Sequence, residues 1–170
     1  MLLGFTPHSV RPRAQRAEPP VVTSDANHSV DPTECRPMAG PERYDALTLM
    51  RAFRADEARL SDALNLFVER EDYGFVWLAY REDTALGCCS VGYTVSTAAG
   101  GLTAVVRDLY VIPAARRGGI ATAMLAALAA RLAALDVART EIAANGDAGL
   151  LAFVAARGLT VTAAIFAPGR

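Results

Sequence analysis

The sequence contains no lysine, so all 17 of its basic side chains are arginine. A P-loop for nucleoside triphosphates needs a lysine after its second glycine, and this absence therefore excludes one. Cysteine is also scarce, because Cys35, Cys88 and Cys89 are the only three. Their odd number and their spacing argue against a disulfide framework and against a metal site. Neighbouring strand residues point to opposite faces of a sheet, so Cys88 and Cys89 would not bond to each other. We therefore expect both to be free thiols, which fits a reducing cytoplasm.

A strong net charge and a long apolar run are missing as well. The formal net charge is −1, which favours neither nucleic acid nor an anionic membrane as a partner. A membrane helix needs roughly 18–20 apolar residues, and the closest run, residues 119–135, is broken by an arginine. Both histidines lie within residues 1–32, a segment with five prolines and no apolar periodicity. We expect this segment to be a disordered N-terminal tail, or a misassigned start, before a single domain over residues 33–170.

The apolar pattern beyond residue 32 predicts an α+β fold, in which helices flank a mixed and mostly antiparallel sheet. Its turn signals divide the chain into strands over 33–37, 75–80, 85–95, 102–112, 137–144 and 160–167, and helices over 41–55, 57–70, 119–135 and 147–157. The strand–helix–strand order makes strands 102–112 and 137–144 a parallel pair with a right-handed crossover.

The most informative stretch is residues 108–121, in which an apolar strand meets a proline, a loop rich in arginine and glycine, and a long helix. The first amides of a helix have no partner within it, and the helix dipole adds to their attraction for an anion. Gly118 and Gly119 would let a phosphate approach the main chain, and Arg116 and Arg117 would add forked donors. This order predicts a pyrophosphate site, although an ordinary strand-to-helix turn with exposed arginines would have a similar sequence.

The spacing of this loop differs from that of a dinucleotide-binding fold, whose glycines follow the first strand and precede an acidic residue by about 20 positions. Arg116, Gly119 and Ala121 instead fill the pattern Arg-x-x-Gly-x-Ala. This pattern resembles the acetyl-CoA pyrophosphate loop of the GCN5-related N-acetyltransferases (GNAT superfamily). Residues 92–100, together with the run Asp-Leu-Tyr-Val-x-Pro at 108–113, are similar to the diamine (spermidine/spermine) acetyltransferase branch.

The resemblance implies a specific architecture for the site. The two parallel strands would splay apart, and pantetheine would lie between them against the backbone of Leu109 and Val111. Residues 116–121 would hold the pyrophosphate, and Thr122 would add a hydroxyl. Asn145 would lie near CoA, or else serve only as a turn residue before Gly146. The cofactor-binding residues implied in this way are Leu109, Val111, Arg116, Arg117, Gly118, Gly119, Ile120, Ala121, Thr122 and Asn145.

Two departures from the family pattern concern proton transfer. Val154 stands where the family has the tyrosine that protonates the leaving thiolate, and Arg107 stands where the diamine branch has a glutamate base. Asp108 and Tyr110 are the substitutes that we consider as catalytic residues, with core packing as the alternative for the tyrosine. Strand alternation would place Arg107 and Asp108 on opposite faces.

The expected activity is an acetyl-CoA-dependent transfer of an acetyl group to the amine of a small-molecule or amino-acid-like acceptor by direct attack. The amide of Val111 would stabilise the oxyanion, and Arg107 would disfavour a polyamine if it faced the acceptor. An alternative is a GNAT-fold module that binds acyl-CoA but lacks the usual acid and base. A nucleotide-binding α/β protein of another type is a third. Many relatives dimerise, so the resemblance also implies a homodimer.

Overall fold

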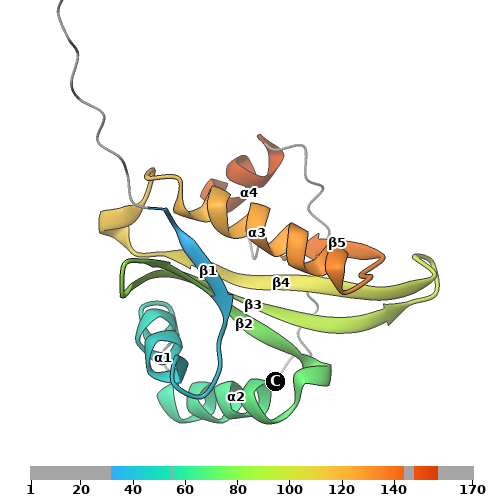
Figure 1. Cartoon of the computed structure of the whole chain (residues 1–170), viewed down its shortest axis with the longest axis horizontal. Coiled ribbons are helices and arrows are strands. Elements are labelled where there is room, and N and C mark those ends of the chain that lie inside the picture. The colour runs from blue at the N-terminus through green and yellow to red at the C-terminus, as the bar shows by residue number, and fades with distance from the viewer. Residues whose placement is uncertain (1–31, 55, 144–147, 157–170) are drawn as a thin grey trace, which may run out of the picture. The chain divides into compact units, whose positions relative to one another are not determined.

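The computed structural model describes residues 32–54, 56–143 and 148–156 of the chain (Figure 1). The segment expected to be a tail, residues 1–32, lies outside this part apart from Pro32, as does the strand predicted over 160–167. None of the described helices is both long and apolar enough to cross a membrane.

In the part of the chain that the structure describes, five strands form one sheet, in the order in which they follow one another in sequence. They are β1 (Glu34–Pro37), β2 (Gly74–Arg81), β3 (Thr84–Ser96), β4 (Gly101–Val111) and β5 (Arg139–Ile142). Each neighbouring pair is antiparallel except β4 and β5, which are parallel. The prediction of a mostly antiparallel sheet with one parallel pair is therefore confirmed.

The described residues also form four α-helices and two short 3₁₀ helices. They are α1 (Arg43–Arg51), α2 (Glu57–Glu69), η1 (Glu71–Tyr73), η2 (Pro113–Ala115), α3 (Ile120–Ala134) and α4 (Ala148–Ala155). The first is shorter than the predicted helix over 41–55, because the amides of Ala52 and Phe53 bond three residues back and close the last turn. This early end leaves Phe53 to pack on a neighbouring strand instead of continuing the helix.

The helices lie on both faces of the sheet, with α1 and α2 on one and α3 and α4 on the other (Figure 1). Each face has its own apolar core, which we call the α3 core and the α1–α2 core. Cys89 belongs to the first and Cys88 to the second, so the expectation of two free thiols on opposite faces is confirmed. Burial raises the pKa of Cys88 to about 12 and raises that of Cys89 as well, which keeps both thiols protonated and inert.

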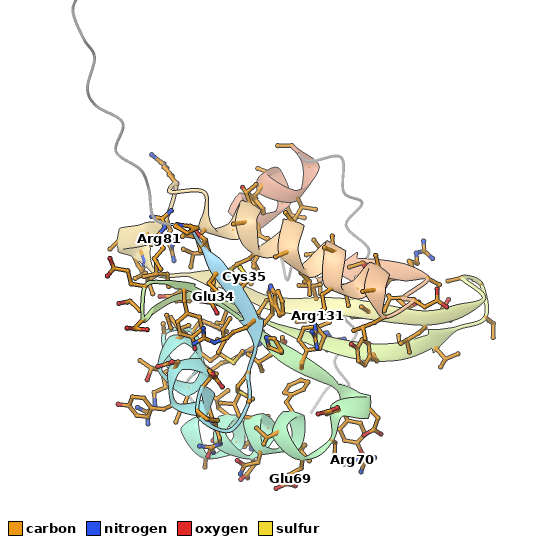
Figure 2. The ribbon with its side chains drawn as sticks, viewed as in Figure 1. Glu34, Cys35, Glu69, Arg70, Arg81 and Arg131 are labelled. Atoms are coloured by element: carbon orange, nitrogen blue, oxygen red, sulfur yellow. The ribbon has the colours of Figure 1, made fainter. Side chains whose placement is uncertain are left out.

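The arginine that interrupts the apolar run of α3 takes part in the packing of the helix on the sheet. The Arg131 guanidinium lies 5.2 Å from the ring of Phe75 and 5.9 Å from that of Trp77 on β2 (Figure 2). Trp77 in turn donates its indole N–H to the Met124 carbonyl of α3 at 3.2 Å. These contacts hold α3 against β2.

A β-bulge divides β4 into two halves with opposite alternation. The register with β3 shifts between Cys88 and Ser90, and Asp108 takes a left-handed conformation with φ 55°. Before the bulge, Val106 packs in the α3 core; after it, Tyr110 packs against the α1–α2 core, although both numbers are even. One extra residue in a strand reverses which side chains face which side, and that is the effect here.

Candidate active site

The loop between β4 and α3 forms around two left-handed residues. Arg117 has φ 63° and Gly119 has φ 80°, and α3 starts directly after the glycine. Gly118 does not have a positive φ, but a Cβ on it would lie 3.1 Å from the Ala115 carbonyl oxygen. The two glycines therefore serve different needs, since one permits the turn and the other permits a close backbone approach.

The first amides of α3 have no acceptor among the residues that the structure describes. In the described part of the chain, no backbone carbonyl accepts from the amides of Gly119, Ile120 or Ala121. The helix also lacks a side-chain cap at Gly119. Three N–H groups at the positive end of a 15-residue helix are thus available to an anion.

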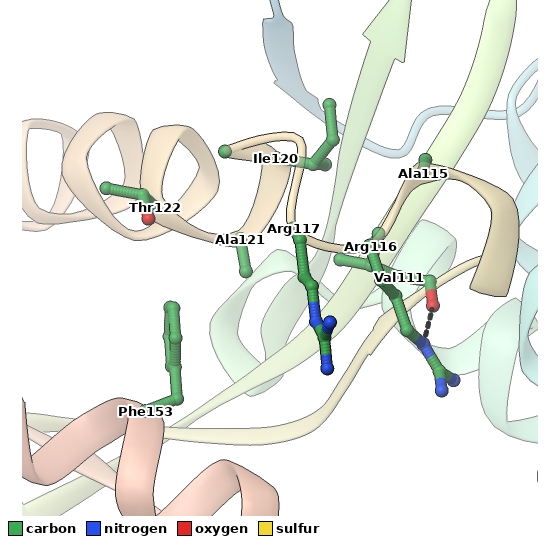
Figure 3. Close-up of a pocket in the computed structure, with 9 residues that line it drawn as sticks. Val111, Ala115, Arg116, Arg117, Ile120, Ala121, Thr122 and Phe153 are labelled. Carbon is green, nitrogen blue, oxygen red and sulfur yellow. Dashed lines mark hydrogen bonds between the residues drawn. The ribbon is translucent and has the colours of Figure 1, made fainter.

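A cavity of about 310 Å³ opens at this helix end (Figure 3). Seven of the predicted cofactor-binding residues line it: Val111, Arg116, Arg117, Gly119, Ile120, Ala121 and Thr122. The side chain of Ile120 is itself buried in the α3 core, so this residue offers its backbone. Leu109 and Gly118 are absent from the lining, and Asn145 lies outside the described residues.

Arg116 ties the loop to the edge of β4. Its Nε donates to the Val111 carbonyl at 3.0 Å, and its guanidinium carbon lies 5.7 Å from the centre of the Tyr110 ring. Arg117, also exposed, extends from the same loop (Figure 3). The cavity mouth therefore carries two cations that suit phosphate oxygens.

The strand that leads into the loop presents unpaired backbone on the side away from β3. Among the described residues, its pairing with β5 ends where Ala143 donates to the Val106 carbonyl at 2.9 Å. Beyond the bulge, Ile112 donates to Leu86 of β3 at 2.9 Å. Amides of neighbouring strand residues point to opposite edges, so the Val111 amide points to the open edge. Among the described residues, no strand pairs with this edge of β4 beyond that point, so its backbone is open to an extended ligand.

The α4 side of the cavity differs from the sequence prediction. Val154 is fully buried in the α3 core, so its side chain does not reach the cavity. Phe153 lines the cavity instead, and Figure 3 shows it extending from α4 toward the first turn of α3. The position that faces the cavity is therefore one residue earlier than predicted, and its side chain also carries no ionisable proton.

The two catalytic candidates lie on the α1–α2 side of β4. Tyr110 packs its ring 5.1 Å from that of Phe53, which follows α1. The Asp108 carboxylate forms an ion pair with Arg54 and accepts a 3.0 Å hydrogen bond from the Ser90 hydroxyl. Both carboxylate oxygens are thus engaged, and Asp108 would have to lose Arg54 before it could take a proton from an amine.

Regular alternation predicted that Arg107 and Asp108 lie on opposite faces of β4, and this prediction is wrong, because both lie on the same face. Arg107 pairs with Ser90 across the strands, and Ser90 is also the residue that bonds the Asp108 carboxylate. The bulge therefore brings both side chains to the α1–α2 face. Arg107 is exposed, and no acidic partner is found for it within the described ranges. Those ranges also contain no cluster of side chains suited to a metal ion.

Arg81, at the end of β2, is a residue of the site that the sequence did not reveal. It donates from Nη2 to the Gly118 carbonyl at 2.8 Å, and so joins the β2–β3 turn to the loop. No motif marks it, because the two residues are 37 positions apart and only the sheet order brings them together.

Replacing Arg81 with methionine is expected to weaken CoA binding about ten-fold, because the loop loses a charge-assisted hydrogen bond. Isothermal titration with CoA measures the change. Arg70→Met is the matched control, since Arg70 pairs only locally with Asp72 far from the loop (Figure 2). An unchanged affinity in Arg81→Met would mean that the loop holds its shape without this contact.

The chain is similar to known acetyltransferases in sequence pattern and in fold. A model of the Acetyltransferase (GNAT) family matches residues 41–158. No curated protein sequence matches the chain.

Solved structures that share its fold include the following three. Aminoglycoside 6'-N-acetyltransferase AAC(6')-IG from Acinetobacter haemolyticus has 20% identity and a TM-score of 0.67 over 81% of this chain and 97% of that one. AAC(6')-Iy with the bisubstrate analogue CoA-S-monomethyl-acetylneamine has 16% identity and a TM-score of 0.68 over 82% and 99%. A predicted acetyltransferase with acetyl-CoA from Clostridium acetobutylicum has 13% identity and a TM-score of 0.65 over 81% and 96%.

Proposed function

Because the chain belongs to the GNAT acetyltransferase family, we propose that it transfers an acetyl group from acetyl-CoA to the amine of a small-molecule or amino-acid-like acceptor. The observation that carries this proposal is the unpaired amides of Gly119, Ile120 and Ala121 beside two arginines in one cavity. A pyrophosphate needs such donors, and a helix N-terminus provides them without a lysine. The spermidine/spermine-like branch is not part of the proposal, since the solved relatives reported above are aminoglycoside enzymes and a predicted acetyltransferase.

The residues that would hold acetyl-CoA follow from this geometry. Arg116, Arg117 and the amides of the first turn of α3 would bind the pyrophosphate. The open edge of β4 would bind the extended pantetheine, with the Val111 amide directed toward it. When bound, acetyl-CoA supplies the thioester carbonyl carbon, to which the amine nitrogen bonds as the carbon–sulfur bond breaks. The same amide can donate to the carbonyl oxygen as that oxygen gains charge.

The described residues offer few groups that can transfer a proton during the reaction. The Asp108 carboxylate is held by Arg54 and Ser90, and Phe153 offers no proton from α4. Tyr110, on the residue before Val111, is the proton donor that we propose, and water reaching the open edge would accept the amine proton. Positioning of the reactants alone lowers the activation barrier by roughly 7–11 kcal/mol. General acid–base catalysis raises the rate by about 10²–10⁴-fold, which is the smaller effect. A slow enzyme is therefore the expected outcome.

The second candidate is a module that binds acyl-CoA without turning it over. The observation that favours it is the pairing of both Asp108 oxygens opposite an aprotic Phe153. Such a protein would bind the same ligand with the same loop, so binding alone does not separate it from an enzyme. For either candidate, the free thiols favour a cytoplasmic location, and a homodimer is the oligomeric state that we propose.

Two measurements test the proposal in order. CoA and acetyl-CoA are expected to raise the melting temperature, because a ligand at 100 times its Kd stabilises the fold by about 2.7 kcal/mol, whereas ATP and NAD are expected to have no effect. Thiol release from acetyl-CoA over a panel of amines then measures turnover, and Cys88 and Cys89 add little background because burial keeps them protonated. Release no faster than in buffer across the panel would favour the binding module.

A further inference from the structure

Three arginines from different elements converge on the α1–α2 side of the open β4 edge. Arg54 follows α1, Arg107 lies on β4, and Arg116 belongs to the loop before α3. Arg54 pairs with Asp108, and Arg116 lies over the Tyr110 ring, which packs in turn on Phe53 beside Arg54. Arg107 precedes Asp108 on β4 and shares its face. This face is the one opposite α3, where an acceptor can approach the edge without crossing the pyrophosphate loop.

Asp108 does not present an open carboxylate to an approaching amine. Arg54 donates to its Oδ1, and the Ser90 hydroxyl donates to its Oδ2 at 3.0 Å. The Asp108 side chain is 20% exposed, and that of Arg54 is 49% exposed. Arg54 therefore occupies the place that a cationic acceptor would need, and it leaves its own outer surface toward solvent.

The other charged side chains considered on this face do not cancel the positive charge near the bulge. Glu141 of β5 pairs with Val105 by register, so it shares the face of Arg107, but its carboxylate lies 3.6 Å from Arg139. That pair adds no net charge. Within the described residues, the Arg54 charge is matched by Asp108, Arg116 donates to the Val111 carbonyl, and Arg107 forms no ion pair.

We propose that Arg107, with Arg54 beside the bulge, binds an anionic group of the acceptor. The substrate class is then an amine that also carries a carboxylate or a phosphate, and polyamines and aminoglycosides are disfavoured by like charge. This inference rests on the proposed acetyl transfer for its chemistry. It separates the chain from AAC(6')-Iy and AAC(6')-IG, which share the fold at 20% identity or less. Guanidinium groups suit both anions, because their forked donors match two oxygens at once.

The test compares acceptors of similar length and different charge. Four acceptors are measured for binding to the CoA complex by calorimetry, and for kcat/KM by thiol release. They are 4-aminobutyrate, 3-aminopropyl phosphate, 4-aminobutanamide, whose far end is uncharged, and 1,4-diaminobutane. We expect one of the two anionic amines to exceed the diamine about ten-fold or more in both measurements. The two anions distinguish a carboxylate site from a phosphate site, and the amide gives the affinity without the charge.

Variants assign this preference to residues. Arg107→Gln is expected to lower the preference for the anionic amine about five- to ten-fold, a modest loss because the side chain is exposed. Arg54→Gln is expected to shift the preference toward the diamine, because it frees the Asp108 carboxylate. Arg59→Gln is the matched control, since Arg59 is an exposed arginine of α2 whose ion pair is with Asp56 and not with a residue of β4.

Two results would overturn the inference. One is equal or tighter binding of the diamine by the unaltered protein, whether or not turnover occurs. The other is an anion preference that Arg107→Gln leaves intact. Thiol release with the diamine alone would overturn the inference while acetyl transfer stood. Preferential binding of the anionic amine that Arg107→Gln abolishes, without any thiol release, would support the anion site and count against acetyl transfer.

Discussion

Replacing Gly119 with glutamate is expected to lower the affinity for CoA at least a hundred-fold. The substitution puts a carboxylate beside the amides of Ile120 and Ala121, where the pyrophosphate would lie. Two like charges about 4 Å apart cost about 4 kcal/mol at an effective dielectric of 20, and partial exposure of the site reduces that cost. Isothermal titration with CoA measures the loss, and thermal unfolding without ligand confirms that the variant is folded.

Gly119→Ala separates charge from backbone strain in this experiment. No atom lies within 4 Å of a Cβ built on Gly119, so alanine fits, but its φ of 80° is unfavourable for any side chain. A left-handed residue costs roughly 1–2 kcal/mol, so both variants should lose similar stability. Only glutamate should lose most of the affinity. If Gly119→Glu binds CoA as well as Gly119→Ala does, the pyrophosphate does not lie at this helix end.

Replacing Phe153 with tyrosine is expected to raise kcat about ten-fold. Phe153 lines the cavity from α4, and a hydroxyl there can protonate the departing thiolate. The gain stays at the low end of the range for general acids, because a thiol with a pKa near that of cysteine, about 8.5, leaves readily without help. Thiol release measured from pH 7 to 11 tests the role, since the added activity should fall near pH 10 as tyrosine deprotonates.

Val154→Tyr is the comparison that decides which α4 position faces the thiolate. Val154 is fully buried among α3 core side chains, so the larger ring overpacks the core at a cost of about 1–3 kcal/mol. We expect a lower melting temperature and no gain in kcat. A rise in kcat for this variant, with none for Phe153→Tyr, would mean that α4 is rotated by one residue relative to this structure.

Much of the fold could be predicted because local signals agreed with one another. The turn at Asp72–Gly74 and the glycines at 100 and 101 bounded three strands to within two residues of β2, β3 and β4. The arrangement of strand, loop and helix over residues 101–134 was predictable for the same reason, since its strand, proline, glycines and helix are consecutive in the sequence. Seven of the ten predicted cofactor-binding residues line the cavity.

The rest of the site depends on contacts that no local pattern encodes. Arg54 and Asp108 are 54 positions apart, and their pairing follows from where α1 ends over the sheet. The bulge was not predicted because alternation assumes one residue per step, and nothing in Arg107-Asp108-Leu109 marks the added one. The burial of Val154 was not predicted for a similar reason, since helix periodicity fixes the apolar face of α4 only once its docking angle is known.

The out-of-phase halves of β4 set a condition for anyone transplanting this strand between relatives. A graft that kept every letter but lost one position between Arg107 and Tyr110 would exchange the two faces downstream of the cut. The Val111 N–H would then turn toward β3, Leu109 and Val111 would leave the α3 core, and Tyr110 and Ile112 would leave the α1–α2 core. A functional chimera therefore has to conserve the number of residues across the β-bulge more than their identity.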